Sequence, residues 1–383
     1  MTQIEKFKAG KFVNAINHKA FSPNKINQPY SWTDFELTSL VDKATQKIGS
    51  LDAWSEQVPN IDRFIRMYVL KEATDSSRIE GTQTTMQEAL LKVQDVSPER
   101  KDDWIEVQNY IKAMNDSIEQ LESLPLSSRL IKTAHKTLLS GVRGEDRQPG
   151  EFRRSQNWIG GSSINNAVFI PPIFQEVNEL MGDLEKFLHN KSSGLPHLMK
   201  IGLAHYQFET IHPFLDGNGR IGRLLITLYL VEQKILRKPV LYLSDYFDKN
   251  KNLYYDYLTE VRKKDDLVKW LKFFLTGIIN TAEDSIRVFK ETIILKGKCE
   301  GKLYQLGKKA PSAKLLLDYI FHQPTFDAED CAKATKLSLV SAYSLINDFI
   351  RIGILNELTG FKRNRIFYFP ELFMLFSPKK IME

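Results

Sequence analysis

The sequence predicts a mainly α protein, in which a helical bundle with a small β-hairpin is followed by a winged helix-turn-helix domain. Apolar residues recur at three- and four-residue spacing over much of 61–290, which is the period of amphipathic helices. The segment from Ile221 to Lys234 is apolar on nearly every face, as expected of a helix at the centre of a bundle. After residue 311, three shorter helical runs precede two apolar strands, the order of a winged helix-turn-helix.

The composition is that of an ordinary globular protein. With 383 residues, roughly two or three folding units are expected. Hydrophobic residues are 42% and charged residues 26% of the chain, which excludes wholesale disorder. The sequence has no apolar run of membrane-spanning length and no signal peptide, so we expect no membrane association. Cys299 and Cys331 fit neither a disulfide framework nor a metal site, which favours the cytoplasm. The net charge of +6 permits anionic partners.

Four regions are expected along the chain. They are an N-terminal arm and helical region over 1–100, a catalytic core over 101–295, a linker over 296–311 and a winged-helix-like domain over 312–383. Residues 1–50 are polar and interrupted by prolines, which predicts an extended arm. A helix from about Pro59 is expected to end at Gly81, since glycine suits the left-handed position after a helix. Thr85 and Glu88 then form the capping box of another helix.

Further helices and a hairpin make up the core. The helices are expected near 101–122, 126–140 and 173–190, as two helices around a loop within 197–235, and near 248–264 and 266–290. Apolar residues at 158–159 and 167–170 flank a Gly/Ser/Asn turn, the pattern of a β-hairpin. The Lys/Gly-rich stretch 296–311 is typical of a linker. Beyond it we expect helices at 312–322, 328–334 and 338–352, and strands near 354–355 and 366–369.

The richest segment chemically is 212–223, His-Pro-Phe-Leu-Asp-Gly-Asn-Gly-Arg-Ile-Gly-Arg. Its three glycines leave the backbone bare, so that successive N–H groups can converge on an anion. A helix opens directly afterwards, and its N-terminus points at the same place. Arg220 and Arg223 lie on one face of the first turn, where cations are disfavoured unless a polyanion sits between them. The segment therefore predicts a phosphate-binding loop.

Two more residues of this loop suggest chemistry. Asp216 offers a hard oxygen ligand for Mg²⁺, which needs few protein ligands when phosphates supply the others. His212 titrates near neutral pH and could take a proton from an attacking hydroxyl. Each residue alone is more often part of an ordinary turn, but the whole set within twelve residues favours phosphoryl or nucleotidyl transfer. His205 and His212 lack the partners of another metal centre, and no nucleophile elbow of a serine hydrolase is present.

The same segment resembles the signature of the Fic family, His-Pro-Phe-x-(Asp/Glu)-Gly-Asn-Gly-Arg-x-x-Arg, at every defined position. The resemblance extends over roughly 60–290, including Pro149-Gly150-Glu151-Phe152-Arg153 and the hairpin. It implies a Fic-type helical bundle and AMPylation, the transfer of AMP from ATP to a hydroxyl of a protein target or of the enzyme itself. By this resemblance His212 is the base that deprotonates a Ser, Thr or Tyr of the target, and Asp216 holds Mg²⁺.

The resemblance also assigns the ATP-binding residues. Arg223 is expected to pair with the γ-phosphate, and the other phosphates are expected to bind to Gly217, Asn218, Gly219, Arg220, Ile221 and Gly222. The adenine pocket is expected near Tyr254, where Arg262 replaces a more usual Asn. A sister branch, the death-on-curing kinases, carries Lys at the position of Gly219 and transfers the γ-phosphate. Gly219 therefore favours nucleotidyl transfer.

A second motif lies upstream of the core, in Ser76-Ser77-Arg78-Ile79-Glu80-Gly81. Counting along the helix places Ser76 and Glu80 on the packed face, where a carboxylate needs a cationic partner. The string resembles the inhibitory motif (Ser/Thr)-x-x-x-Glu-(Gly/Asn) of Fic proteins with an N-terminal inhibitory helix. The resemblance implies that Glu80 pairs with Arg223, displaces the γ-phosphate and inhibits the enzyme in cis. In some relatives this Glu also supports AMP removal, so a de-AMPylating hydrolase is an alternative.

The remaining expectations concern partners. By resemblance, the hairpin residues Asn166, Ala167, Val168 and Phe169 form a flap, which could dock an extended target segment through main-chain hydrogen bonds. In the C-terminal domain, a cluster of basic residues could touch DNA phosphates, namely Lys362, Arg363 and Arg365. Winged helices also serve in dimerisation, so a homodimer stays open and DNA binding is not favoured. A nucleotide-sensing DNA-binding regulator is the other alternative.

Overall fold

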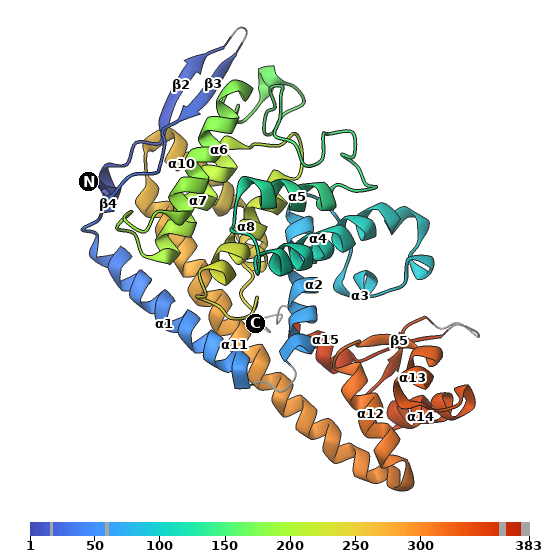
Figure 1. The fold of residues 1–383 in the computed structure, drawn as a ribbon. Coiled ribbons are helices and arrows are strands. Elements are labelled where there is room, and N and C mark those ends of the chain that lie inside the picture. The colour runs from blue at the N-terminus through green and yellow to red at the C-terminus, as the bar shows by residue number, and fades with distance from the viewer. Residues whose placement is uncertain (16–17, 58–60, 360–364, 377–383) are drawn as a thin grey trace.

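The computed structural model describes residues 1–15, 18–57, 61–359 and 365–376. The chain is mainly helical, as predicted (Figure 1). Its α-helices are α1 (Phe35–Gln57), α2 (Ile61–Ile79), α3 (Met86–Ala89), α4 (Lys101–Gln120), α5 (Ser128–Leu138), α6 (Val177–His189), α7 (His197–Ile211), α8 (Asn218–Glu232), α9 (Ser244–Lys249), α10 (Lys251–Lys264), α11 (Leu267–Leu303), α12 (Ala310–Ile320), α13 (Ala328–Thr335), α14 (Leu339–Arg351) and α15 (Pro370–Phe376). Among the described residues, no helix is both long and apolar enough to cross a lipid bilayer.

Helices α7 and α8 form the centre of the bundle. Residues 198–211 of α7 are all buried, and nearly all of α8 is buried as well. Helix α8 packs against α2, α4, α5 and α7 (Figure 1), which is the position expected for a helix that is apolar all round. The capping box of Thr85 and Glu88 at α3 is present as predicted.

The N-terminal arm is shorter than predicted. Strands β1 (Thr2–Gln3) and β4 (Tyr30–Ser31) pair in parallel, and β2 (Gly10–Asn14) pairs antiparallel with β3 (Lys19–Pro23). Residues from Phe35 onward are helical, because the buried Leu37, Val41, Ala44, Ile48 and Leu51 follow a helical period. This stripe packs α1 along α11.

The stretch 296–311 is helical and not the loop that a linker would form. Helix α11 continues to Leu303, and a 3-10 turn over Tyr304–Lys309 leads into α12. The buried Leu295, Cys299 and Leu303 extend the apolar stripe at four-residue spacing. Gly297 and Gly301, which suggested a linker, lie on the exposed side of the helix.

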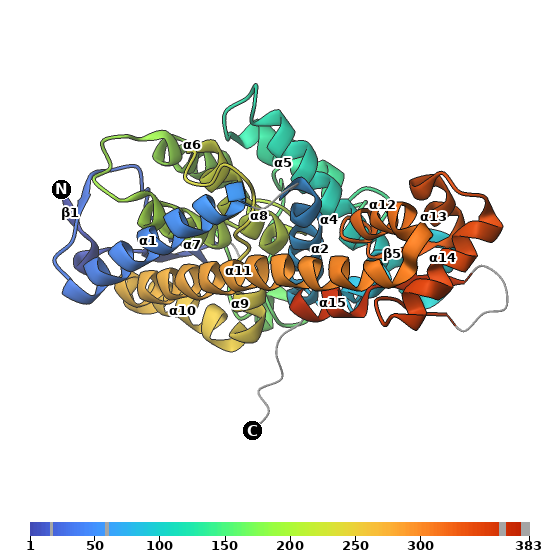
Figure 2. The same ribbon diagram turned by 90° about the horizontal axis from the view of Figure 1, so that it is seen from below.

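The C-terminal part combines α12, α13 and α14 with an antiparallel sheet in the order β5-β7-β6. Its strands are β5 (Thr325–Asp327), β6 (Asn356–Glu357) and β7 (Ile366–Tyr368). Lys362 and Arg363 lie outside the described residues, and Arg365 pairs with Glu357. Helix α15 packs on α11 (Figure 2). Its Phe376 ring lies 5.1 Å from the Tyr68 ring of α2.

Candidate active site

The motif loop is closed by one of its own side chains. Helix α7 ends at His212, whose φ of 50° is left-handed, and Gly217 at φ 72° turns the chain into α8. The Asn218 Oδ1 accepts a hydrogen bond from the Phe214 N–H at 2.8 Å, and its Nδ2 donates to the Phe214 carbonyl at 2.8 Å. The side chain of Asn218 therefore shapes the loop, which leaves backbone N–H groups to face an anion.

His135 of α5 holds the loop from the other side. Its Nδ1 accepts a hydrogen bond from the Gly150 N–H at 2.8 Å, so its Nε2–H donates to the Asp216 carbonyl at 3.0 Å. The imidazole also stacks on Phe214 at 3.8 Å. Burial lowers the pKa of His135 to about 4, so the ring is neutral at pH 7. Sequence reasoning missed this residue, because a lone histidine on a helix carries no motif.

His212 is anchored through its backbone. Its carbonyl oxygen accepts hydrogen bonds from the Arg153 Nε at 3.0 Å and the Asn157 Nδ2 at 3.2 Å. Burial, together with the nearby Arg262 and Arg153, lowers the pKa of His212 to about 3. Its buried Nδ1 has no hydrogen-bond partner among the described residues. At neutral pH the imidazole is therefore uncharged and able to accept a proton.

Arg223 is buried and hydrogen-bonded to Ser76 and Glu80, which is the pairing with Glu80 that the motif resemblance implied. Its Nη2 donates to Glu80 Oε1 at 2.7 Å and to the Ser76 carbonyl at 2.8 Å, and its Nε donates to Ser76 Oγ at 2.9 Å. Gly81, at φ 106°, lies just after the end of α2, the position predicted for it. Partial burial raises the pKa of the Glu80 carboxyl, but Arg223 more than offsets it and the net pKa is lowered.

The carboxylate of Glu80 lies where an anion was expected. A side chain at Gly219 would collide with Glu80 Oε1 and come within 3.0 Å of Arg223 Nη1. The carboxylate is thus in direct contact with the glycine-rich backbone and with the arginine at once. One carboxylate thus contacts both Gly219 and Arg223, two of the residues that were expected to bind phosphate.

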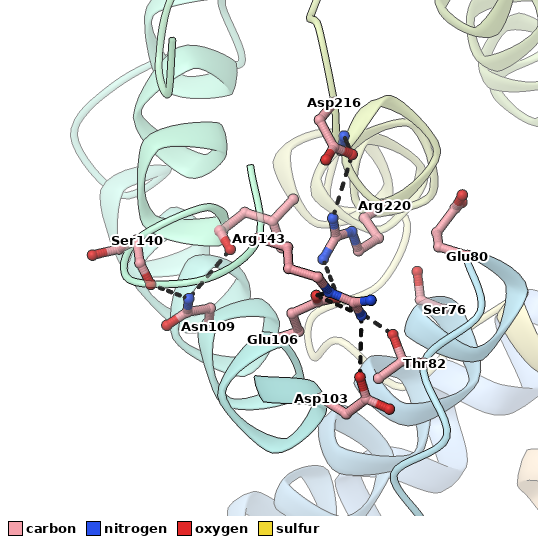
Figure 3. A network of polar contacts seen from close by, with 12 residues as sticks. Ser76, Glu80, Thr82, Asp103, Glu106, Asn109, Ser140, Arg143, Asp216 and Arg220 are labelled. Carbon is pink, nitrogen blue, oxygen red and sulfur yellow. Dashed lines mark hydrogen bonds and ion pairs between the residues drawn. The ribbon is translucent and has the colours of Figure 1, made fainter. Parts of the chain in front are cut away.

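Arg220 is the second buried arginine of the loop. Its Nη1 donates to Glu106 Oε2 of α4 at 3.1 Å, and its Nη2 lies 3.8 Å from Asp216 Oδ1 (Figure 3). The carboxylate of Asp216 is half exposed, with Oδ1 also accepting from the Gly217 N–H. No group of three or more His, Cys, Asp or Glu that could hold a metal occurs among the residues the structure describes. Asp216 is the one carboxylate within the motif.

Tyr254, the residue expected near the adenine pocket, lies in the buried core. It is buried, and its O–H donates to His205 Nε2 at 2.9 Å, while the His205 Nδ1–H donates to the Gly222 carbonyl at 2.9 Å. Burial lowers the pKa of His205 to about 3, so this relay is uncharged. The neighbouring Tyr255 is the exposed ring of the pair. Through His205, Tyr254 is linked to the backbone of the motif at Gly222.

The predicted hairpin is reduced to one bridge, Ile159 with Phe169. A 3-10 turn over Ile164–Asn166 fills the tip, where Asn166 caps the turn in place of regular strand pairing. Ala167 follows in extended conformation, Val168 is 70% exposed, and Phe169 is buried under the Arg262 guanidinium at 3.9 Å. Arg262 also donates to Thr210 Oγ1 at 3.1 Å.

Glu209 is a buried carboxylate that sequence reasoning missed. It lies one turn before His212 on α7, and its Oε1 has no hydrogen-bond partner within the described part of the chain. Burial raises its pKa to about 7, although Arg223 acts in the opposite direction. Only its helical spacing from His212 could have identified it.

Comparison with known proteins identifies the same region. Residues 38–119 match the model of the Fic/DOC family N-terminal domain, and residues 125–230 match that of the Fic/DOC family. The chain is 35% identical over 140 residues to protein adenylyltransferase Fic of Aedes aegypti, a match that covers 36% of this chain and 25% of that protein. The Drosophila melanogaster protein of the same name is 34% identical over 122 residues, covering 32% of this chain and 23% of its own length. The match thus spans about a quarter of these relatives.

Solved structures share the fold. A Fic family protein from Desulfovibrio desulfuricans superposes with a TM-score of 0.56 at 22% identity, over 89% of this chain and 98% of that one. A Fic domain containing signaling protein from Bacteroides thetaiotaomicron gives 0.53 at 18% identity, over 66% and 97%. At these identities the likeness shows the fold alone.

Proposed function

This chain belongs to the Fic/DOC family, and from that premise we propose that it is a protein adenylyltransferase. It transfers AMP from ATP to a hydroxyl side chain of a target protein and of itself. The observation that carries the proposal is the single anion site formed by Gly219 and Arg223, one turn from Arg220. A glycine at this contact and two buried arginines suit a polyphosphate better than a single carboxylate.

The chemistry follows from the positions of these groups. The target hydroxyl gives its proton to the neutral imidazole of His212, and its oxygen bonds to the α-phosphorus. The bond from that phosphorus to the bridging oxygen breaks, and pyrophosphate leaves with the electron pair. Arg220 and Arg223 stabilise the charge that develops on the phosphates. The flap, at which Val168 is exposed, is where the target segment docks.

Mg²⁺ fits the loop as a cofactor. The half-exposed carboxylate of Asp216 supplies one hard oxygen, and Mg²⁺ usually keeps several waters and takes its other ligands from substrate phosphates. When bound, the ion would neutralise charge on the phosphates. Asp216, fixed through its carbonyl by His135, is the residue that would hold it.

The contact between Glu80 and Arg223 supports inhibition in cis. Arg223 can satisfy one strong anionic partner at a time at this position, either Glu80 or the γ-phosphate. With Glu80 in place, ATP binds without the alignment that in-line attack needs.

The test is transfer of label from ATP to protein in the presence of Mg²⁺. We expect label on the α-phosphate to transfer and label on the γ-phosphate not to transfer. His212→Ala should reduce transfer by about 10²–10⁴-fold while ATP binding persists, because only the base is lost. Transfer of γ-label alone would place the protein among kinases. Release of AMP from a modified protein, without its transfer, would instead indicate a hydrolase.

A further inference from the structure

We propose that Glu106 is a positioning residue that turns one edge of the Arg220 guanidinium toward the nucleotide phosphates. Glu106 is outside the signature motif, in the middle of α4. The inference rests on the proposed function, because it concerns how that site holds its phosphates.

The carboxylate of Glu106 is fixed by donors from three separate segments. Its Oε2 accepts from Arg220 Nη1 at 3.1 Å and from Thr82 Oγ1 at 3.3 Å. Its Oε1 accepts from Arg143 Nε at 3.3 Å, and Arg143 in turn contacts Asp103 at 3.1 Å (Figure 3). The side chain of Glu106 is only 6% exposed. A carboxylate held at both oxygens in a buried place has little freedom to rotate, so it can set the orientation of a partner.

Glu106 binds the Arg220 guanidinium at Nη1 and does not occupy the edge formed by Nε and Nη2. A guanidinium group binds phosphates in a bidentate manner through two neighbouring N–H groups, and one such edge is formed by Nε and Nη2. Glu106 uses Nη1 alone. The Arg220 Nε is buried with no hydrogen-bond partner among the residues described here, and Nη2 faces Asp216 at 3.8 Å.

A buried donor without a partner is costly unless a ligand supplies the acceptor. The unpartnered Nε and the adjacent Nη2, which has a 3.8 Å ion pair with Asp216, therefore identify the edge that would receive a phosphate. Figure 3 shows Arg220 between Asp216 on one side and Glu106 on the other. Glu106 therefore holds the guanidinium from the side opposite Asp216. Position matters more than charge in this arrangement, because a second negative charge next to a phosphate would by itself weaken binding.

Two substitutions separate position from charge. Glu106→Gln keeps the length and an acceptor oxygen toward Arg220 but removes the charge, whereas Glu106→Asp keeps the charge and withdraws it by one methylene. The matched control is Asp103→Asn, on the same helix, because Asp103 contacts Arg143 and not Arg220. Calorimetry with Mg²⁺ would measure the affinities for ADP and for adenosine. ADP is chosen because it has no γ-phosphate, so its binding does not depend on displacement of Glu80.

We expect Glu106→Asp to weaken ADP binding by roughly tenfold, the loss of one well-placed charged hydrogen bond. Its affinity for adenosine should stay unchanged. Glu106→Gln should bind ADP within about threefold of wild type, and Asp103→Asn should match wild type. A folding defect would weaken ADP and adenosine alike and would overturn a positioning role.

Other results contradict the inference in distinct ways. Loss in Glu106→Gln with retention in Glu106→Asp would show that charge, not position, matters. Unchanged ADP affinity in both variants would leave Glu106 a purely structural ion pair, with the proposed function intact. If wild type itself binds no ADP, the proposed function fails, whatever the Glu106 variants do.

Discussion

Arg223 and Arg220 lie one turn apart on α8, and each is held by a carboxylate from a different helix. The Glu80 side chain that binds Arg223 is 35% exposed and comes just after the last residue of α2. The Glu106 side chain that binds Arg220 is 6% exposed and lies within α4. Arg223 keeps two contacts to Ser76 if Glu80 departs, whereas Arg220 has, among the described residues, Asp216 at 3.8 Å as its one polar side-chain contact besides Glu106.

The difference separates a replaceable partner from a permanent one. A carboxylate at a helix end, partly in water, can be exchanged for a phosphate at low cost, because its charge stays solvated after it leaves. A carboxylate fixed by three donors in the interior cannot leave without stranding buried charges. Two chemically similar ion pairs, formed by arginines one turn apart on α8, are thus suited to the two opposite tasks proposed above, inhibition and support.

The largest expected effect is on stability. Glu106→Leu should lower the free energy of unfolding by about 3–5 kcal/mol, because it strands the buried Arg220. Glu80→Leu should lower it by less, since Arg223 keeps its contacts to Ser76. Urea unfolding of the two variants, measured side by side, checks the contrast. Equal losses would mean that both pairs are structural.

The next effect is on activity. Glu80→Gly should raise self-AMPylation by about 100-fold, because Arg223 becomes free for the γ-phosphate and ATP can align for attack. Transfer of α-label from ATP measures it. Adding Arg223→Ala to the same protein should remove the gain. A gain that survives in the double variant would assign inhibition to something other than this pair.

The pKa direction of Glu80 gives a further check on the same pair. Its pKa is lowered, so the carboxylate stays charged and the ion pair persists until the pH falls below about 4.5. Wild-type protein should therefore remain inhibited at pH 5.5.

Glu209 is a third carboxylate to compare with Glu80 and Glu106. It is close to Arg223, but its Oε1 accepts no hydrogen bond from a described residue. Its pKa is raised to about 7, so the folded state holds a proton that the unfolded chain loses near pH 4.5. Stability from this group is full below pH 4.5 and is lost as the pH rises through about 7. Relative to wild type, Glu209→Gln should gain about 1–3 kcal/mol between pH 5 and pH 8. Thermal unfolding across that range measures it, and parallel curves would refute it.

The smallest effect concerns Tyr254. Tyr254→Phe should cost about 1–2 kcal/mol of stability, because His205 Nε2 loses its donor. Affinity for ATP should stay within about twofold, since the ring stays in the core. Tyr255→Phe serves as the neighbouring control. A tenfold loss of ATP affinity in Tyr254→Phe would restore Tyr254 to the nucleotide pocket.

Short-range patterns made the motif predictable. The glycines, His212, Asp216 and the two arginines are adjacent in sequence, and the structure forms one loop from them. The pairing of Glu80 with Arg223 spans 143 positions, and it was reached only through a resemblance of motifs. Short-range patterns also made much of the fold predictable, because helical periodicity places α4 to α8 within a few residues of their observed bounds.

Other features depend on packing that no local pattern encodes. His135, Glu106 and Glu209 look like ordinary helical residues until tertiary contacts bury them. Gly297 and Gly301 suggested a break, but the stripe of Leu295, Cys299 and Leu303 outweighs the low helix propensity of two exposed glycines. The flap has one bridge in place of the predicted strand pairing, and the Asn166 side chain instead accepts a hydrogen bond from the Ser163 N–H in the turn.

The contact between Phe376 of α15 and Tyr68 of α2 has a thermodynamic consequence. Helix α2 leads to Glu80, so the C-terminal part of the chain rests on the element that delivers the inhibitory carboxylate. If displacement of Glu80 by a nucleotide changes the free energy of that ring contact, reciprocity requires that loss of the contact change the affinity for the nucleotide by the same factor.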